Sequence, residues 1–175
     1  SNVTMTQVPG GSPTDIALGN TTGGYTEVAD DLYYSNSDLL AELCEPYQMI
    51  AAAHQISFSL DLPEKFPALL LVGPFSKVVS NILANAVAYT ETGKSVSVCI
   101  DGHSLVVENE CTPIPDNEIH RLFEPFYRPD FSRSSESGGN GLGLYIIDTL
   151  LTSMDISYSF VPIESPPGMC FTIQL

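Results

Sequence analysis

Apolar residues recur at three- and four-residue spacing in three parts of the chain, which is the pattern of a helix with one buried face. The first part follows Ser35-Asn36-Ser37, a run of good N-cap residues, and contains Pro46, a residue able to kink a helix. The second part follows Gly73-Pro74, and the third follows a glycine-rich run. The spacing therefore predicts helices over residues 38–51, 75–89 and 142–154.

Alternating apolar and polar residues, typical of a strand with one buried face, occur over residues 56–62, 96–100 and 104–107. Asp101-Gly102, between the last two, is a signal for a hairpin turn. Further strands are expected over residues 27–34, 68–72, 156–161 and 169–175, the last two joined through residues 166–168, and a short helix after Pro115. This order predicts an α/β (α+β) two-layer sandwich, with a mixed, mostly antiparallel sheet packed on three helices.

Length and charge restrict the class of protein. A chain of 175 residues that is 43% hydrophobic is long enough for one domain with a sizeable core. Its longest apolar run is far shorter than the ~18 residues that a membrane-spanning helix needs. A net charge of −15 argues against nucleic acid as a partner and against direct contact of this fragment with an anionic membrane.

The cysteines and the first residues predict little chemistry. The four cysteines are scattered singly, which is typical of free thiols in a reducing cytoplasm and not of a zinc site. Residues 1–27 are rich in Gly, Thr, Ser and Pro and are interpreted as a linker or irregular tail, in which Ser1-Asn2 has the look of vector residues. The globular domain is therefore expected over residues 28–175.

Two asparagines stand out in the second predicted helix. Asn81 and Asn85 are four residues apart, so they share one face of the helix, away from its apolar positions. Two amide oxygens held one turn apart are suitable ligands for a hard cation such as Mg²⁺. Two solvated asparagines are the alternative interpretation of this pair.

A glycine-rich run precedes the third predicted helix. Glycines at 139, 141 and 143 allow a ligand to approach the backbone closely, and the helix that follows directs free N–H groups and its dipole toward an anion. Half of the six basic residues, Arg121, Arg128 and Arg133, lie just before this run. The arrangement favours binding of a polyanion such as a nucleotide phosphate, although solubilising surface arginines are an alternative.

Taken together, four segments in this order resemble the catalytic and ATP-binding domain of sensor histidine kinases, a member of the GHKL superfamily that includes DNA gyrase B and Hsp90. Residues 81–86 resemble the N box, residues 107–115 the first glycine box, residues 123–128 the F box, and residues 138–144 the glycine-rich ATP-lid region. Gly168 and Phe171 match the final glycine box. The resemblance covers residues ~28–175 and implies a Bergerat-type ATP-binding fold with ATP and Mg²⁺ as cofactors.

The resemblance also implies residue roles. Asn81 and Asn85 correspond to the residues that act in catalysis and hold the metal ion. The positions expected to contact the nucleotide are Asn81, Asn85, Tyr89, Asn109, Ile114, Phe126, Arg128, Arg133, Gly139, Gly141, Leu142, Gly143 and Leu144. Phe126 is equally well suited to packing under the lid.

The chain departs from the family pattern at the first glycine box and after the N box. Asn109 replaces the Asp that accepts a hydrogen bond from adenine, and Cys111 and Pro113 replace two glycines. An amide still has an acceptor oxygen, but it can flip where a carboxylate cannot, so discrimination against guanine is expected to be weaker. Ala88 stands where a basic phosphate contact is common, and Lys77, one helical turn before Asn81, is a candidate substitute.

The resemblance implies a two-component kinase, and within that class the chain is similar to the vancomycin-resistance (VanS-like) type of sensor. Its activity is transfer of the ATP γ-phosphoryl group to a histidine on a separate dimerisation domain of the same full-length protein, with a response regulator as a further partner. The fragment is then the cytoplasmic domain of a membrane-anchored bacterial protein. None of its three histidines lies in a phosphoacceptor setting.

Three alternatives stay open. An ATP-hydrolysing clamp such as gyrase B or Hsp90 carries a Glu as general base where this chain has Asn81. An anti-sigma-factor serine kinase of the same superfamily usually has His at the position of Tyr89. A nucleotide-binding interaction module, or degenerate kinase, is compatible with the altered first glycine box.

Overall fold

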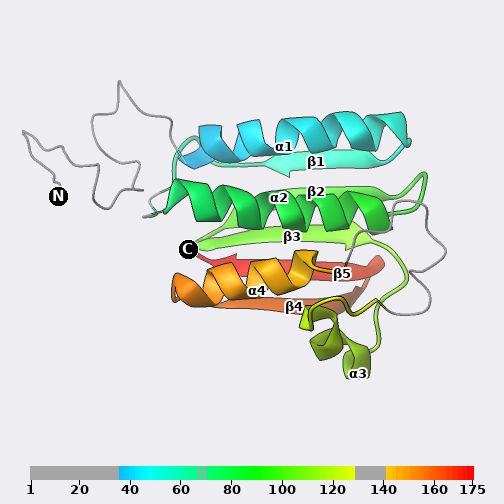
Figure 1. Ribbon diagram of the computed structural model, residues 1–175. Helices are drawn as coiled ribbons and strands as arrows, with labels where there is room; N and C mark the ends of the chain where they lie inside the picture. The colour runs from blue at the N-terminus through cyan, green and yellow to red at the C-terminus, as the bar shows by residue number, and fades with distance from the viewer. Residues whose placement is uncertain (1–35, 67, 69, 129–140) are drawn as a thin grey trace, which may run out of the picture. The chain divides into compact units, whose positions relative to one another are not determined.

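The computed structural model describes residues 36–66, 68, 70–128 and 141–175 (Figure 1). The predicted tail over 1–27 and strand over 27–34 lie outside these residues. In chain order the elements are α1 (Asn36–Ala53), β1 (Ser57–Asp61), α2 (Val72–Tyr89), β2 (Ser95–Asp101), β3 (Ser104–Glu110), α3 (Asp116–Ile119), the 3₁₀ helix η2 (His120–Phe123), α4 (Gly143–Ser153), β4 (Tyr158–Glu164) and β5 (Pro167–Gln174). The chain divides into two compact units, Ser1–Glu42 with Pro63–Lys77, and Leu43–Leu62 with Val78–Leu175.

In the first unit, side chains at the start of α1 hold the segment that precedes α2. Asn36 Nδ2 donates hydrogen bonds to the carbonyl oxygens of Phe66 and Ala68 at 3.1 and 3.0 Å, and Ser37 Oγ donates to Pro63 O at 2.6 Å. Residues 68, 70 and 71 belong to no strand and α2 begins at Val72, so the predicted strand over 68–72 is wrong.

The second helix begins earlier than predicted, at Val72 instead of Phe75. Pro74 lies in its first turn, where the missing proline N–H would have no partner within the helix. Proline is therefore compatible with a helix start here, and the sequence signal at Gly73-Pro74 marks the first turn and not the residues before it.

The second unit contains a five-stranded sheet in the order β1-β2-β3-β5-β4. β1 and β2 pair in parallel and the other pairs are antiparallel, so the mixed, mostly antiparallel sheet is confirmed. Asp101 pairs with Ser104, which shifts the predicted turn by one residue to Gly102-His103, with Gly102 at φ +61°. Glu164 pairs with Pro167, so the β4–β5 turn is Ser165-Pro166 and not residues 166–168.

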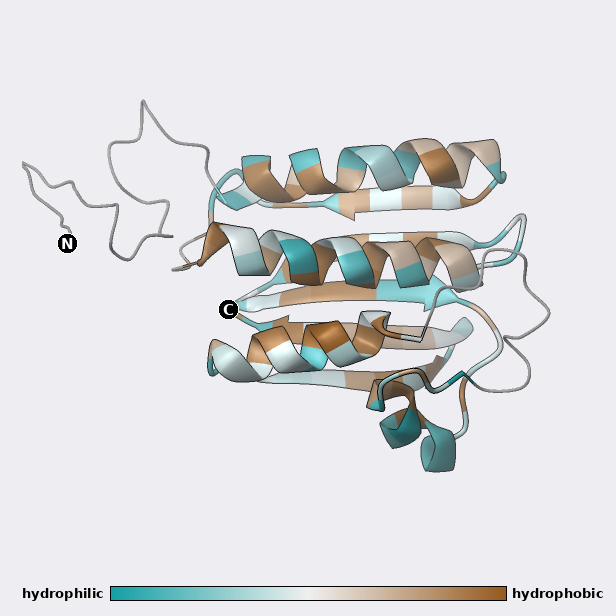
Figure 2. Cartoon of the chain, in the orientation of Figure 1, coloured by the Kyte–Doolittle hydropathy of each residue, from teal (hydrophilic) through white to brown (hydrophobic). Residues whose placement is uncertain are grey.

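One face of this sheet is apolar and covered by helices. α4 and the parts of α1 and α2 that belong to the second unit lie over that face (Figure 1). Figure 2 shows hydrophobic residues along the middle of β3 and hydrophilic ones at its end. The buried residues of this unit include Val96, Val98, Leu105, Val107, Met169, Phe171 and Ile173 from the sheet, and Val78, Ile82, Leu83, Ile147 and Leu151 from α2 and α4. Their period-2 and period-3.6 spacings confirm the predicted hairpin and helices. No helix in the described ranges has both the length and the apolarity to cross a bilayer.

An aromatic cluster joins η2, β4 and β5. Phe123 contacts Tyr158 and Phe160 with ring centroids 5.7 and 6.2 Å apart, and Tyr158 stacks on Phe171 at 5.3 Å. Tyr158 Oη donates a hydrogen bond to Asp148 Oδ1 of α4 at 2.8 Å. Burial, and then the hydrogen bond to Asp148 and its charge, raise the pKa of Tyr158.

Tyr158→Phe is expected to lower the free energy of unfolding by about 1 kcal/mol at neutral pH, because Asp148 loses its phenol partner. Above the ordinary tyrosine pKa of 10.0, the unfolded chain releases the Tyr158 proton and the folded chain keeps it. Wild-type stability should therefore fall with rising pH by at most ~1.4 kcal/mol per pH unit from this group, less where water screens the phenol. Urea unfolding of both proteins on either side of pH 10 checks this, and parallel pH curves would contradict it.

Candidate functional site

The two asparagines of α2 face the first residue of α4. Both side chains are half-buried, beside the buried stripe of α2. A Cβ placed on Gly143 would lie 3.3 Å from Asn85 Nδ2 and 3.6 Å from Asn81 Oδ1. The predicted common face of Asn81 and Asn85 is therefore confirmed, and the missing side chain of Gly143 lets the start of α4 approach both amides closely.

The start of α4 brings positive polarity to the same place. The helix runs from Gly143 to Ser153, and Leu142 occupies its N-cap position without a side-chain cap. The first-turn N–H groups of an α-helix have no partner within the helix, and they carry the positive end of its dipole. Amide oxygens of α2 and the N-terminus of α4 thus meet at one point, in an arrangement suited to a cation together with an anion.

Phe126 and Gly141, which lie between η2 and α4 in the chain, contact each other through their backbones. Phe126 N donates a hydrogen bond to Gly141 O at 3.0 Å. Gly141 has φ +77°, and a Cβ there would lie 2.9 Å from the Phe126 carbonyl carbon, so glycine is required on both grounds. Phe126 is 72% exposed, and the lid residues 129–140 under which it was expected to pack lie outside the described residues. Arg133 and Gly139 lie outside the described residues.

Asn109 is a polar residue at the end of an apolar stripe. On β3 it follows Leu105 and Val107 at two-residue spacing, so its side chain lies on the same buried face of the strand, and it is 9% exposed. Its Nδ2 donates a hydrogen bond to Thr90 Oγ1 at 3.3 Å, and Thr90 Oγ1 donates to Ala86 O at 2.6 Å. The C-terminal end of α2 therefore holds the amide of Asn109.

The segment after Asn109, where the family glycines are replaced, is held by β5. A Cβ on Gly168 would lie 2.2 Å from Asn109 O, which shows how closely β5 approaches β3 here. Cys111 N donates to Pro167 O at 3.2 Å, and Ile114 N donates to Met169 Sδ at 3.3 Å. Burial is the main effect that raises the pKa of Cys111, so its thiol is neutral at physiological pH.

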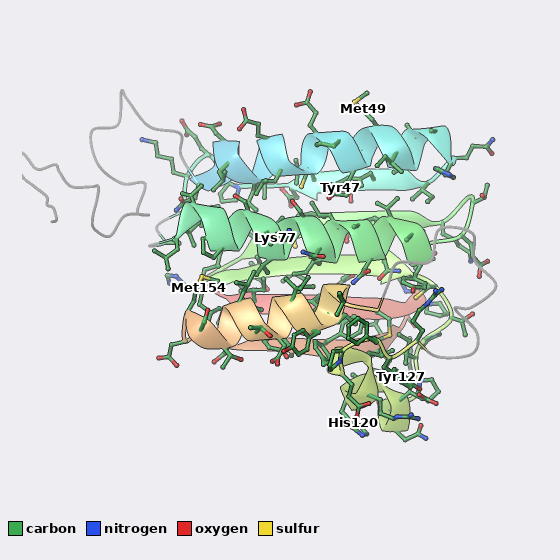
Figure 3. The ribbon with its side chains drawn as sticks, in the orientation of Figure 1. Tyr47, Met49, Lys77, His120, Tyr127 and Met154 are labelled. Carbon is green, nitrogen blue, oxygen red and sulfur yellow. The ribbon has the colours of Figure 1, made fainter. Side chains whose placement is uncertain are left out.

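One of the three arginines belongs to a separate cluster. Glu118 of α3 accepts a hydrogen bond from Tyr127 Oη at 2.6 Å and lies 3.9 Å from Arg121 Nη1. The Arg121 guanidinium also lies 4.2 Å from the centre of the Tyr127 ring, and Figure 3 shows Tyr127 beside α3. The described contacts of Arg121 are thus with Glu118 and Tyr127. Arg128 is half-buried.

Residues 73–175 match the family of histidine kinase-, DNA gyrase B-, and HSP90-like ATPases. The chain belongs to this family. The sensor histidine protein kinase HK06 of Streptococcus pneumoniae is 29% identical over 137 residues, which cover 78% of this chain and 30% of HK06. The sensor protein VanSB of Enterococcus faecalis is 35% identical over 140 residues, which cover 78% of this chain and 31% of VanSB. This histidine kinase-like ATPase thus spans about a third of the length of these curated relatives.

Solved structures show the same fold. The mycobacterial sensor histidine kinase MprB aligns with a TM-score of 0.69 at 24% identity, over 81% of this chain and 95% of MprB. The catalytic domain of histidine kinase ThkA aligns with a TM-score of 0.67 at 18% identity, over 81% of this chain and 92% of that domain. The α/β fold of histidine kinase catalytic domains, predicted from the sequence, is confirmed.

The domain brings together Asn81, Asn85 and Gly143, three of the positions expected to contact the nucleotide. Tyr89 is exposed, and Leu142 and Leu144 are half-buried at the start of α4. The contact of Thr90 with Asn109 was not among the predictions from the sequence. The signal was the continuation of the buried positions Ile82 and Ala86 to Thr90 at four-residue spacing, which places a hydroxyl at the end of the buried stripe.

Proposed function

We propose that this ATPase domain binds Mg·ATP and transfers the γ-phosphoryl group to a histidine on a separate dimerisation domain of the same full-length protein, from which a response regulator takes it. In the transfer, the bond from the γ-phosphorus to the β–γ bridging oxygen breaks, a phosphorus–nitrogen bond forms, and ADP leaves. The observation that carries the proposal is the position of Gly143, at the N-terminus of α4, directly against Asn81 and Asn85.

The residues take the following roles in this proposal. The N-terminus of α4, with Leu142, Gly143 and Leu144, lies against the phosphates, where backbone N–H groups bind anions well. Asn109, Ile114 and Tyr89 line the base, and Phe126 and Gly141 form the root of the lid. Arg128 and Arg133 pair with phosphate oxygens, because a guanidinium binds them in bidentate fashion. Gly139 allows the lid backbone to approach the nucleotide.

The α2 asparagines fit a magnesium ion. Mg²⁺ prefers oxygen ligands and keeps several waters, so it needs few protein ligands beside the nucleotide phosphates. Asn85, with Asn81, would supply those oxygens, and a side chain at position 143 would fill the space between them and α4. When bound, the ion neutralises charge on the phosphates, while the domain's own groups position the nucleotide, which is most of what phosphoryl transfer requires.

Transfer is favoured over hydrolysis by the residue at position 81. A water molecule that attacks the γ-phosphorus has to give up a proton, and a carboxylate can accept it. Asn81 has an amide at this place, which does not act as a general base at neutral pH. We therefore place this domain with the kinases of the family and not with its hydrolysing clamps.

The setting of the domain is part of the same proposal. We assign the ATP-binding domain to residues 28–175, with residues 1–27 as a linker, and place it on the cytoplasmic side of a membrane-anchored bacterial sensor. The similarity to VanSB supports a sensor of the vancomycin-resistance type.

A phosphotransfer assay tests the function. The chain is incubated with Mg²⁺ and γ-labelled ATP, alone and with an added histidine-bearing dimerisation domain from the same full-length protein. We expect acid-labile label on the added domain and almost none on His54, His103 or His120. Nucleotide binding without transfer would favour a nucleotide-binding interaction module, and label on an added serine protein would favour a serine kinase.

Asn85→Ala is expected to weaken ATP binding about tenfold in the presence of Mg²⁺, equivalent to about 1.4 kcal/mol, because an oxygen ligand is lost. In EDTA, affinity should be almost unchanged. Asn85→Asp keeps an oxygen and should be milder. Calorimetric titrations with Mg²⁺ and with EDTA measure both effects.

The matched control for this variant is Asn117→Ala, which removes an exposed asparagine of α3. It should leave both titrations unchanged. If Asn85→Ala weakens binding equally with Mg²⁺ and with EDTA, the metal role of Asn85 is wrong.

A further inference from the structure

The hydrogen bonds around Asn109 determine which end of its amide faces Thr90. The Thr90 hydroxyl has a single proton, and it is donated to Ala86 O at 2.6 Å. Toward Asn109 the hydroxyl therefore presents only lone pairs, and these accept from Asn109 Nδ2 at 3.3 Å. The NH₂ group is consequently directed at Thr90, and Oδ1 is the end of the amide left for other partners.

The Cys111 side chain favours the same orientation of the amide. Its interaction with the Asn109 side chain lowers the pKa of the Cys111 thiol, against the larger effect of burial, as expected when the amide NH₂ group is directed at the sulfur. The hydrogen bonds at Thr90 carry the assignment. Thr90 accepts only the NH₂ end, because a flipped amide would set Oδ1 against the hydroxyl lone pairs or break the bond to Ala86 O.

We propose that Thr90 is a positioning residue for base specificity, which holds Asn109 so that its oxygen reads the amino group of adenine. This inference rests on the proposed binding of ATP and adds how the base is selected. A carboxylate at position 109 would present an acceptor in either orientation. An asparagine presents one only when the amide is held, and Thr90, the residue directly after α2, supplies that constraint.

The constraint has a measurable consequence for nucleotides that carry an oxygen in place of the adenine amino group. Inosine triphosphate is the suitable probe, because it replaces the amino group with O6 and lacks the extra amino group of guanine. With Thr90 present, O6 faces Asn109 Oδ1 and two acceptors meet. Without the hydroxyl, the amide flips and Nδ2 donates to O6, so inosine triphosphate binds better relative to ATP.

The experiment measures, by calorimetry in the wild type and four variants, the dissociation constant for inosine triphosphate divided by that for ATP. Thr90→Val removes the hydroxyl at nearly constant shape, and Thr90→Ser retains the hydroxyl as the matched control. Asn109→Asp is made alone and combined with Thr90→Val. A carboxylate at position 109 has two acceptor oxygens, so its orientation no longer matters. Thr90→Ala is a second hydroxyl-free variant for the case that Thr90→Val does not fold, with folding checked by circular dichroism.

We expect the dissociation constant for inosine triphosphate, divided by that for ATP, to be about tenfold lower in Thr90→Val than in the wild type. In the inosine triphosphate complex of this variant, one hydrogen bond replaces two opposed acceptors. Thr90→Ser should keep the wild-type ratio, and Thr90→Val in the Asn109→Asp background should leave the ratio of that background unchanged. A general loss of packing would lower both affinities together and leave the ratio constant.

Two results would overturn the inference while the proposed function stands: ATP binds, but the ratio is the same with and without the Thr90 hydroxyl, or it falls equally in the Asn109→Asp background. Absence of binding of either nucleotide to the wild type would instead overturn the proposed function itself.

Discussion

Gly168→Ala is expected to lower the free energy of unfolding by about 3 kcal/mol or more, at the upper end of the range for overpacked sites. The added Cβ would lie 2.2 Å from the carbonyl oxygen of Asn109 and 3.0 Å from its carbonyl carbon. Both atoms are backbone of the neighbouring central strand, so no side-chain rotation relieves the clash, and β5 has to move away from β3. Urea unfolding followed by far-UV circular dichroism measures the change.

The matched control is Gly73→Ala in α2. A Cβ there has nothing within 4 Å and the backbone is not in the left-handed region. Alanine in a helix is more favourable than glycine by about 0.5–1 kcal/mol, and the ring of Pro74, which disfavours helical backbone at a preceding residue with a Cβ, offsets part of this gain, so this variant should be nearly as stable as the wild type. Equal stabilities for Gly168→Ala and Gly73→Ala would show that β5 does not approach β3 as closely as the structure has it.

Asn109→Leu is expected to weaken ATP binding by about 1–3 kcal/mol, because the amino group of adenine is left without an acceptor in a buried place. The folded state should tolerate the change. Leucine continues the buried stripe formed by Leu105 and Val107, and Thr90 Oγ1 keeps its bond to Ala86 O. We therefore expect lost affinity at nearly unchanged stability, measured by calorimetry and urea unfolding of the same preparation.

Asn109→Asp is the comparison that separates recognition from packing, since it keeps an acceptor and restores the usual residue of the family. It should retain ATP binding, with a modest change from the added charge. Folded Asn109→Leu protein that binds ATP as tightly as the wild type would mean that adenine is held elsewhere or not at all, and the interaction-module alternative would move ahead.

Local patterns predict the elements that form through contacts between nearby residues. The period of the apolar residues over 75–89 identifies α2 because each turn of a helix repeats the same environment. Alternation over 96–107 identifies the β2–β3 hairpin because successive side chains of a strand point to opposite faces of the sheet. The strand predicted over 68–72 failed because the decisive contact is distant in sequence. Asn36 binds the carbonyls of Phe66 and Ala68 from the start of α1, and no local pattern reports this.

By itself, the sequence determined the α/β class, the order of the elements and the residue types of a nucleotide site, since these depend on short-range periodicity and on motifs of fixed spacing. Tertiary structure decided how those residues meet. Gly143 faces Asn85 because α4 and α2 cover the same sheet, and Thr90 orients Asn109 because the end of α2 lies over β3. Such contacts join residues far apart along the chain, so their geometry exists only once the sheet and its helices have packed.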